Sequence, residues 1–157
     1  MGEHPVEAVR VMDRIARVTE PRLPYGEWVF NRVEERDDDV GETVTQVAVA
    51  AAYRLGLAAI VVPTTSGRTA RLVSAHRPRV PVLAVSPRPE TVRRINLLFG
   101  IRSMPAEEWT GLTQLLDSCS ELAKESGIAS SGDLVAITAG LPAQELGTNL
   151  FEIHRVP

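Results

Sequence analysis

The chain has 157 residues, which is enough for one domain with a single buried core. It is 44% hydrophobic, but no apolar run is long enough to span a membrane, and the N-terminus lacks the apolar core of a secretory signal. The net charge is −3 and the arginines are dispersed, so we expect neither a membrane nor a nucleic-acid partner. The lone cysteine, Cys119, cannot form an internal disulfide and predicts a buried thiol in a cytoplasmic protein.

The first predicted element is a helix over residues 5–19. Proline stands in its first turn, where a missing N–H group costs nothing. Apolar residues then recur with helical spacing at Val6, Val9, Met12 and Ile15 or Ala16. Two further prolines, Pro21 and Pro24, are expected to end the helix.

Residues 25–39 look like a polar connector that ends in the acidic run 34–39. A cluster of carboxylates could in principle hold a divalent cation. The preferred interpretation is a solvated linker whose acidic residues also favour the N-terminus of the next helix. We therefore predict no metal site in this chain.

Helices and strands alternate in the rest of the chain, beginning with an alanine-rich helix that suits close packing on a sheet. The predicted order is helix 44–55, strand 58–62, helix 68–76, strand 81–86, helix 89–99, strand 101–104, helix 109–126, strand 134–138 and strand 149–156. Strands joined through helices form parallel units, whereas the last two strands, joined by a loop, should be antiparallel. We predict an α/β fold: three layers, α/β/α, with a mixed, mostly parallel five-stranded sheet and an antiparallel last strand.

The most informative motif lies between the first predicted strand and the helix that follows it. It reads Thr64, Thr65, Ser66, Gly67, Arg68 and Thr69. Hydroxyl groups can donate to phosphate oxygens, glycine lets the backbone approach closely, and the N-terminus of a helix favours negative charge. The alternative is that Ser66 or Thr69 merely caps a surface helix. The local pattern supports both interpretations about equally.

Five short segments follow one another along the chain in a characteristic order and at characteristic separations: Gly2–Val9, Thr64–Thr69, Gly132–Val135, Gly140–Pro142 and Gly147–Asn149. Together they resemble the C-terminal part of pyruvate kinase. The first segment resembles the last helix of that family's catalytic barrel, and the others resemble its regulatory domain. The resemblance implies an N-terminal barrel helix within 1–24, a connector at 25–39 and an α/β domain at 40–157.

The resemblance also implies where a phosphorylated effector binds. Ligands of open α/β sheets lie beyond the C-terminal ends of the strands, where the strand order reverses. In the resembled domain this point lies between the first and fourth strands, which would bring loop 63–69 to loop 139–148. The second loop suits a defined lid, with a plain connection as the alternative. The implied effector-binding residues are Thr64, Thr65, Ser66, Gly67, Arg68, Thr69, Gly140, Pro142 and Gly147.

One departure from the family bears on the choice of effector. Relatives regulated by fructose bisphosphate resemble this chain but carry a lysine in the first loop and an arginine on the long helix. Here the loop position is Thr65, Leu115 lies about where the arginine would be, and residues 103–123 contain no lysine or arginine. We predict a monophosphate, such as a sugar monophosphate or AMP, or a bare phosphate or sulfate; Arg71 or a neighbouring chain could still supply the second cation.

No active site is apparent in the sequence. The lysine–glutamate and aspartate motifs of the resembled barrel are absent, and its magnesium and potassium would belong to that barrel. His4, His76 and His154 are scattered over unrelated elements. We therefore expect no catalysis by this chain alone. The resembled family assembles partly through this domain, so we also expect a homo-oligomer. The alternative is a small free-standing enzyme or phosphometabolite-binding protein on the same scaffold, with Glu145 and Arg68 as its only charged candidates.

Overall fold

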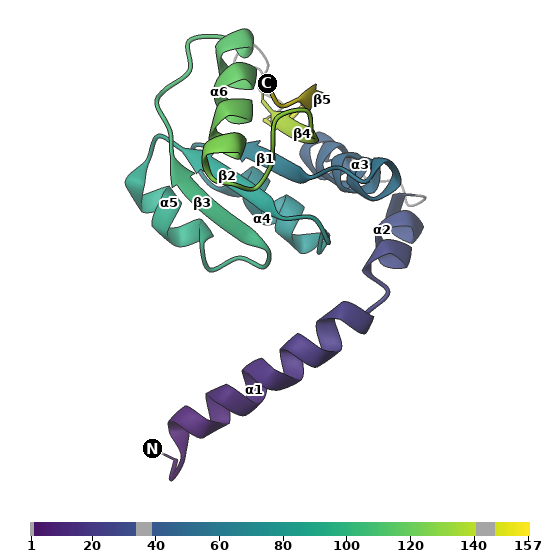
Figure 1. Ribbon diagram of the computed structural model, residues 1–157, viewed down its shortest axis with the longest axis vertical. Helices are drawn as coiled ribbons and strands as arrows, with labels where there is room; N and C mark the ends of the chain where they lie inside the picture. Colours follow the sequence, from purple (N-terminus) through teal and green to yellow (C-terminus); the bar gives the residue numbers. More distant parts are fainter. Residues whose placement is uncertain (1, 34–38, 141–146) are drawn as a thin grey trace.

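The computed structural model describes residues 2–33, 39–140 and 147–157. Its elements follow one another along the chain as drawn in Figure 1. They are α1 (Pro5–Thr19), a 3-10 turn η1 (Glu20–Arg22), α2 (Tyr25–Val33), α3 (Val40–Leu55), β1 (Ala59–Pro63), α4 (Arg68–Ala75), β2 (Val82–Ser86), α5 (Pro89–Ile95), β3 (Ile101–Pro105), α6 (Leu112–Glu125), β4 (Leu134–Ala139) and β5 (Leu150–Arg155). None of the helices in the described part of the chain combines the length and the apolarity needed to cross a membrane.

The five strands form one sheet in the order β3-β2-β1-β4-β5. β1 pairs in parallel with β2 and with β4, so that Ile60 lies opposite Val82 on one side and Ala136 on the other. β3 continues the parallel part beside β2, and β5 runs antiparallel to β4. The predicted mixed, mostly parallel sheet with an antiparallel last strand is thus confirmed.

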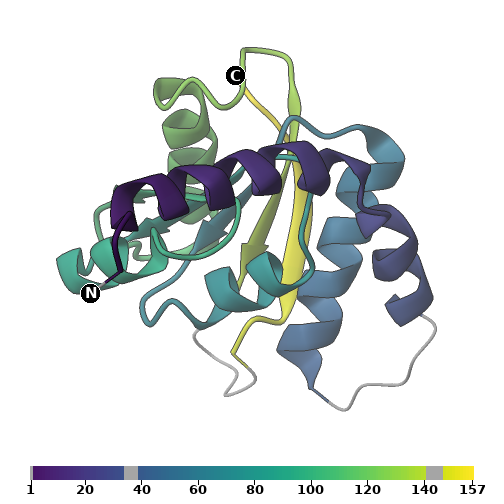
Figure 2. The same cartoon turned by 90° about the horizontal axis from the view of Figure 1, so that it is seen from below.

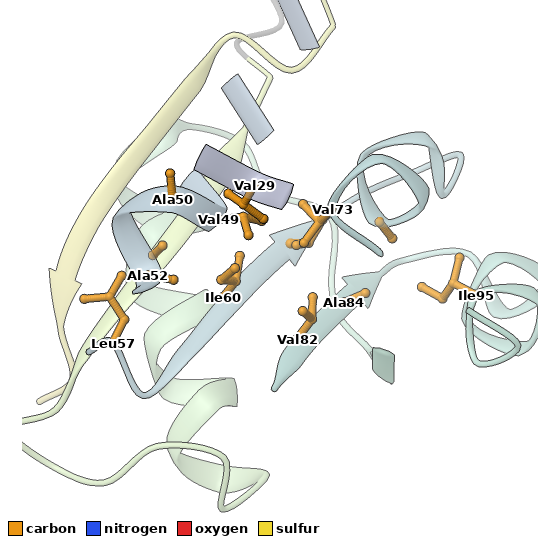
Figure 3. Packing of buried hydrophobic residues seen from close by; sticks show 13 residues of the cluster. Val29, Val49, Ala50, Ala52, Leu57, Ile60, Val73, Val82, Ala84 and Ile95 are labelled. Carbon is orange, nitrogen blue, oxygen red and sulfur yellow. The ribbon is translucent and has the colours of Figure 1, made fainter. Parts of the chain in front are cut away.

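Helices cover both faces of the sheet, because successive side chains of a strand point to opposite sides. Ile60 and Val62 of β1 belong to a buried cluster that also takes in side chains of α2, α3, α4 and α5 (Figure 3). Ala59 and Val61 face the other way, into a second buried cluster with Cys119 of α6. Figure 2 shows α3 and α6 on opposite sides of the sheet, which gives the predicted three layers.

The helix α2 was not predicted, since the sequence analysis treated residues 25–39 as a polar connector. Tyr25 and Val29 are buried, and Val29 packs beside Val49 of α3 in the core (Figure 3). The rings of Tyr25 and Trp28 also form a T-shaped contact, with ring centroids 5.3 Å apart. Part of the predicted connector therefore contributes to the hydrophobic core.

The helix α1 has the predicted bounds and projects away from the rest of the molecule (Figure 1). None of its residues is buried. The apolar side chains that the sequence placed on one face are 59–67% exposed: Val6, Val9, Met12 and Ile15.

Candidate functional site

A cavity of about 520 Å³ opens beyond the C-terminal ends of β1 and β4, where the strand order reverses. Three segments that are distant in the sequence line it. They are the loop and first turn of α4 after β1 (63–66, 68 and 69), the two described ends of the loop between β4 and β5 (139, 140, 147 and 148), and the segment leading into α6 (108, 109, 111, 112 and 115), together with Pro87. The two loops expected to meet therefore do meet.

The loop after β1 is shaped by its own hydrogen bonds. Thr64 donates its N–H to the carbonyl of Val85 at 2.9 Å, which continues the pairing of β1 with β2. The hydroxyl of Thr64 accepts the N–H of Gly67 at 3.0 Å, and so closes the turn. Thr64 is buried, whereas Thr65 and Ser66 are exposed and line the cavity.

Gly67 is needed for this turn but does not line the cavity. Its φ of 82° lies in the left-handed region, which only glycine enters without strain. A Cβ atom at this position would lie 2.8 Å from Cγ2 of Ile95, so α5 leaves no room for a side chain. The loop is therefore fixed in shape by Gly67 and in position by α5.

Two side chains of α5 hold the backbone of the loop. Thr91 donates its hydroxyl to the carbonyl oxygen of Thr65 at 2.9 Å, and Arg94 donates to the carbonyl oxygen of Ser66. A carbonyl oxygen repels an anion, so binding these two oxygens to α5 reduces that repulsion. The first turn of α4 has N–H groups without acceptors inside the helix, and these can face an anion.

The opposite side of the cavity is joined to α4 by a buried contact. The hydroxyls of Thr69 and Thr148 lie 2.6 Å apart, and both residues are less than a tenth exposed. The two ends of the loop between β4 and β5 also touch, because a Cβ atom on Gly140 would lie 2.3 Å from the carbonyl oxygen of Gly147. Glycine at 140 is thus required for the close approach. Pro142 and Glu145 lie outside the described residues.

Arg68 is the one basic side chain among the described residues that line the cavity. Its Nη2 lies 2.5 Å from Oδ2 of Asp39, the residue that precedes α3. Asp39 also caps α3, since its Oδ1 accepts the N–H of Glu42 at 3.0 Å. The hydrogen bond from Glu42, followed by the contacts with Arg68, lowers the pKa of the Asp39 carboxyl below its usual range.

An apolar wall faces the loop after β1, and the sequence analysis did not assign it to the site. Trp109, Leu112, Leu115 and Pro87 form it, and the carboxylate residue Glu108 lies beside it. Trp109 was predicted to begin the long helix but lies in the loop before α6, which starts at Leu112. Within the part of the chain that the structure describes, its buried indole N–H has no hydrogen-bond partner. A signal was present, because this segment follows a parallel strand and such segments meet at one edge of the sheet.

Among the described residues, the remaining candidate groups Cys119, His76 and His154 lie on different elements. Burial raises the pKa of the Cys119 thiol to about 12, so the thiolate is scarce at neutral pH. His76 lies at the far end of α4, 3.4 Å from Glu42, and His154 lies on β5. Over residues 2–33, 39–140 and 147–157, no three His, Cys, Asp or Glu side chains are arranged to hold a metal ion. The acidic positions 34–38 lie outside these ranges.

Comparison with known proteins gives one consistent result. The family model described as pyruvate kinase, alpha/beta domain, matches residues 42–154. The pyruvate kinase of Geobacillus stearothermophilus is 37% identical over 154 residues, which are 98% of this chain and 26% of the relative. The pyruvate kinase of Sporosarcina psychrophila is 35% identical with the same coverage.

Solved structures agree with the sequence comparison. A crystal structure of a pyruvate kinase from Cryptosporidium parvum matches with a TM-score of 0.81 and 26% identity, over 98% of this chain and 30% of that one. The chain thus spans about a quarter of the length of the curated relatives it matches. The match with the family model begins at residue 42, so α1 and α2 lie outside it.

Proposed function

Because this chain belongs to the pyruvate kinase family, we propose that it forms the regulatory part of a pyruvate kinase and binds a phosphorylated effector in the cavity beyond β1 and β4. One observation carries the proposal. A hydroxyl-rich loop, a helix N-terminus and Arg68 line one end of a cavity that lies at the switch point of the sheet. The complete enzyme would transfer phosphate from phosphoenolpyruvate to ADP.

The lining favours a ligand with one anionic end. Hydroxyls of the loop after β1 and N–H groups of α4 can surround a single phosphate. The opposite wall offers Trp109, Leu112 and Leu115, which supply no positive charge for a second phosphate. A sugar monophosphate or AMP therefore suits the cavity better than fructose 1,6-bisphosphate, and inorganic phosphate or sulfate would occupy the same end.

Catalysis is assigned elsewhere in this proposal. Phosphoryl transfer requires cations and metal-binding carboxylates around the moving group. The cavity holds one arginine and one glutamate among its described residues. Magnesium and potassium would act in the three quarters of the relatives' length that this chain does not span. This chain itself requires no cofactor for effector binding.

Calorimetry with a panel of phosphorylated metabolites tests the site. Ser66→Ala removes an exposed hydroxyl of the loop and should weaken binding of the preferred monophosphate, because a hydrogen bond to a charged group contributes about 1.5–3 kcal/mol. Thr69→Ala should weaken it further, although that change also removes the contact with Thr148.

Ser131→Ala is the matched control, since Ser131 is exposed in the loop before β4, at the opposite edge of the sheet. If Ser66→Ala and Ser131→Ala bound the monophosphate with equal affinity, the result would contradict the proposed site. If the chain bound fructose 1,6-bisphosphate tightly and did not bind monophosphates, the result would instead contradict the proposal that the effector is a monophosphate.

A further inference from the structure

Arg68, the cation of the proposed phosphate site, forms an ion pair with Asp39. The guanidinium of Arg68 is 2.5 Å from the carboxylate of Asp39, and the two side chains are 51% and 45% exposed. An anion entering the cavity therefore meets an arginine that is already paired with a carboxylate. Glu108 is the one acidic residue among the described residues that line the cavity.

The ion pair connects the cavity to the N-terminus of α3. Asp39 is the N-cap of that helix, through its hydrogen bond with the N–H of Glu42. Arg68 also lies against the backbone of the first turn, because a Cβ atom on Gly41 would lie 2.8 Å from its Nη1. The same guanidinium is near the other loop, with Nη1 3.9 Å from a Cβ atom built on Gly147. Arg68 therefore lies between the first turn of α3 and the loop that joins β4 to β5.

Glu42 gives α3 a second connection to α4, the helix that begins with Arg68. The side chain of Glu42 lies 3.4 Å from Nε2 of His76, the C-cap residue of α4. The first turn of α3 thus meets α4 at both ends, through Arg68 at its start and His76 at its end. A change in the partner of Arg68 alters one of these two connections and leaves the other in place.

We infer that an anionic ligand and Asp39 compete for Arg68, so that filling the cavity breaks one of the two connections between the first turn of α3 and α4. This inference rests on the proposed function, since it requires an anion to bind among residues 64–69. The ligand gains Arg68 only by breaking the ion pair, so Asp39 lowers the affinity for the ligand. By reciprocity, a change that breaks the ion pair and leaves Arg68 in place raises that affinity.

Asp39→Asn tests the competition directly. Asparagine caps a helix about as well as aspartate, so α3 keeps its N-cap while Arg68 loses its ion pair. Inorganic phosphate, titrated into the whole chain and followed by NMR chemical shifts, should bind about two- to fivefold more tightly to this variant, which is the range expected from an exposed ion pair. Glu125→Gln, which removes a negative charge from the far end of α6, is the control and should leave the affinity unchanged.

A double-mutant cycle distinguishes competition for Arg68 from the general effect of removing a negative charge near the cavity. In an Arg68→Ala background, Asp39→Asn should no longer raise the affinity for phosphate, since the contested group is gone. Gly41→Ala provides a second variant that changes no charge, because its methyl group would lie 2.8 Å from Nη1 of Arg68 and 3.2 Å from Oδ1 of Asp39 and so crowds both partners of the ion pair. It too should bind phosphate more tightly. In the native chain, phosphate should shift the amide signal of Glu42, and Arg68→Ala should abolish that shift.

The outcomes distinguish this inference from the proposed function. Phosphate that binds the native chain and is weakened by Ser66→Ala, but binds Asp39→Asn and Gly41→Ala with native affinity, would overturn the competition and leave the effector site intact. An equal gain from Asp39→Asn with and without Arg68 would overturn it as well. Failure of phosphate to bind either the native chain or Asp39→Asn would remove the effector site and this inference together.

Discussion

At the scale of single residues, Gly67 combines a left-handed backbone with a tight packing contact, and these two demands can be separated by mutation. Gly67→Ala introduces backbone strain and places a methyl group 2.8 Å from Ile95. Gly100→Ala introduces similar strain at a φ of 69°, with no atom within 4 Å of the new Cβ. We expect losses in the free energy of unfolding of about 1–2 kcal/mol for Gly100→Ala and about 2–4 kcal/mol for Gly67→Ala.

Urea unfolding of the two variants measures this difference. Gly67→Ala should also bind phosphate more weakly than Gly100→Ala, because the loop after β1 must shift. Equal destabilisation of the two variants would contradict the contact between Gly67 and α5.

We expect a substitution at Leu115 to change the preference among effectors. It lines the cavity opposite the loop after β1, where no described side chain supplies a second positive charge. Leu115→Arg should raise the affinity for fructose 1,6-bisphosphate by about tenfold or more, since a hydrogen bond to a charged group contributes about 1.5–3 kcal/mol. The affinity for AMP should change much less.

Leu97→Arg is the control for added charge, because Leu97 is 89% exposed and does not line the cavity. Calorimetry with both ligands on both variants measures the effect. The same gain for fructose 1,6-bisphosphate in Leu97→Arg and Leu115→Arg would show that position 115 is not special.

At the scale of elements, α1 presents an apolar face that this molecule leaves uncovered. Exposed apolar stripes of this kind favour association, so we propose that the chain forms a homodimer or a larger oligomer through α1. Met12→Gln with Ile15→Gln should shift the chain towards monomer. The control is Arg10→Gln with Arg14→Gln, which introduces two glutamines on the charged face of α1 and should leave the assembly unchanged.

Light scattering at micromolar concentration reports the mass of each variant. A native chain that is already monomeric, with α1 protected from protease, would contradict this proposal. Protection in a monomer would mean that α1 folds back onto its own domain.

The elements from residue 40 onward could be predicted because their patterns are local. Buried strands such as β1 read as short apolar runs, and α3 has apolar residues at helical spacing up to Gly56. The helix α2 was missed because it is short and is followed by a charged segment, so that Val29 and Tyr25 looked like isolated apolar residues. Its burial depends on α3, which a local pattern cannot reveal.

The candidate site divides in the same way. Residues 64–69 are contiguous, so a phosphate-binding loop could be predicted from the sequence alone. Trp109 and Asp39 come from other parts of the chain, and only the packing of α6 and α3 brings them near the loop. The expected lid could be tested only at its ends, because Pro142 lies outside the described residues.

At the scale of the whole molecule, the chain corresponds to about a quarter of each curated relative. We therefore expect no pyruvate kinase activity from it alone. A coupled assay with phosphoenolpyruvate, ADP, magnesium and potassium should remain at background, because the groups that neutralise a moving phosphoryl group are not gathered in the described cavity. Turnover that follows the protein through purification and survives a contaminant control would place catalysis in this chain.

The central claim is that a single phosphate group is bound between the loop after β1 and the start of α4. A crystal structure of the chain grown with AMP tests it most directly. We expect the phosphate against Ser66 and the first turn of α4, the rest of the ligand towards Trp109 and Leu115, and Arg68 turned from Asp39 to the phosphate. A cavity that stays without AMP at saturating concentration, or AMP bound with its phosphate away from residues 64–69, would contradict the proposed phosphate site.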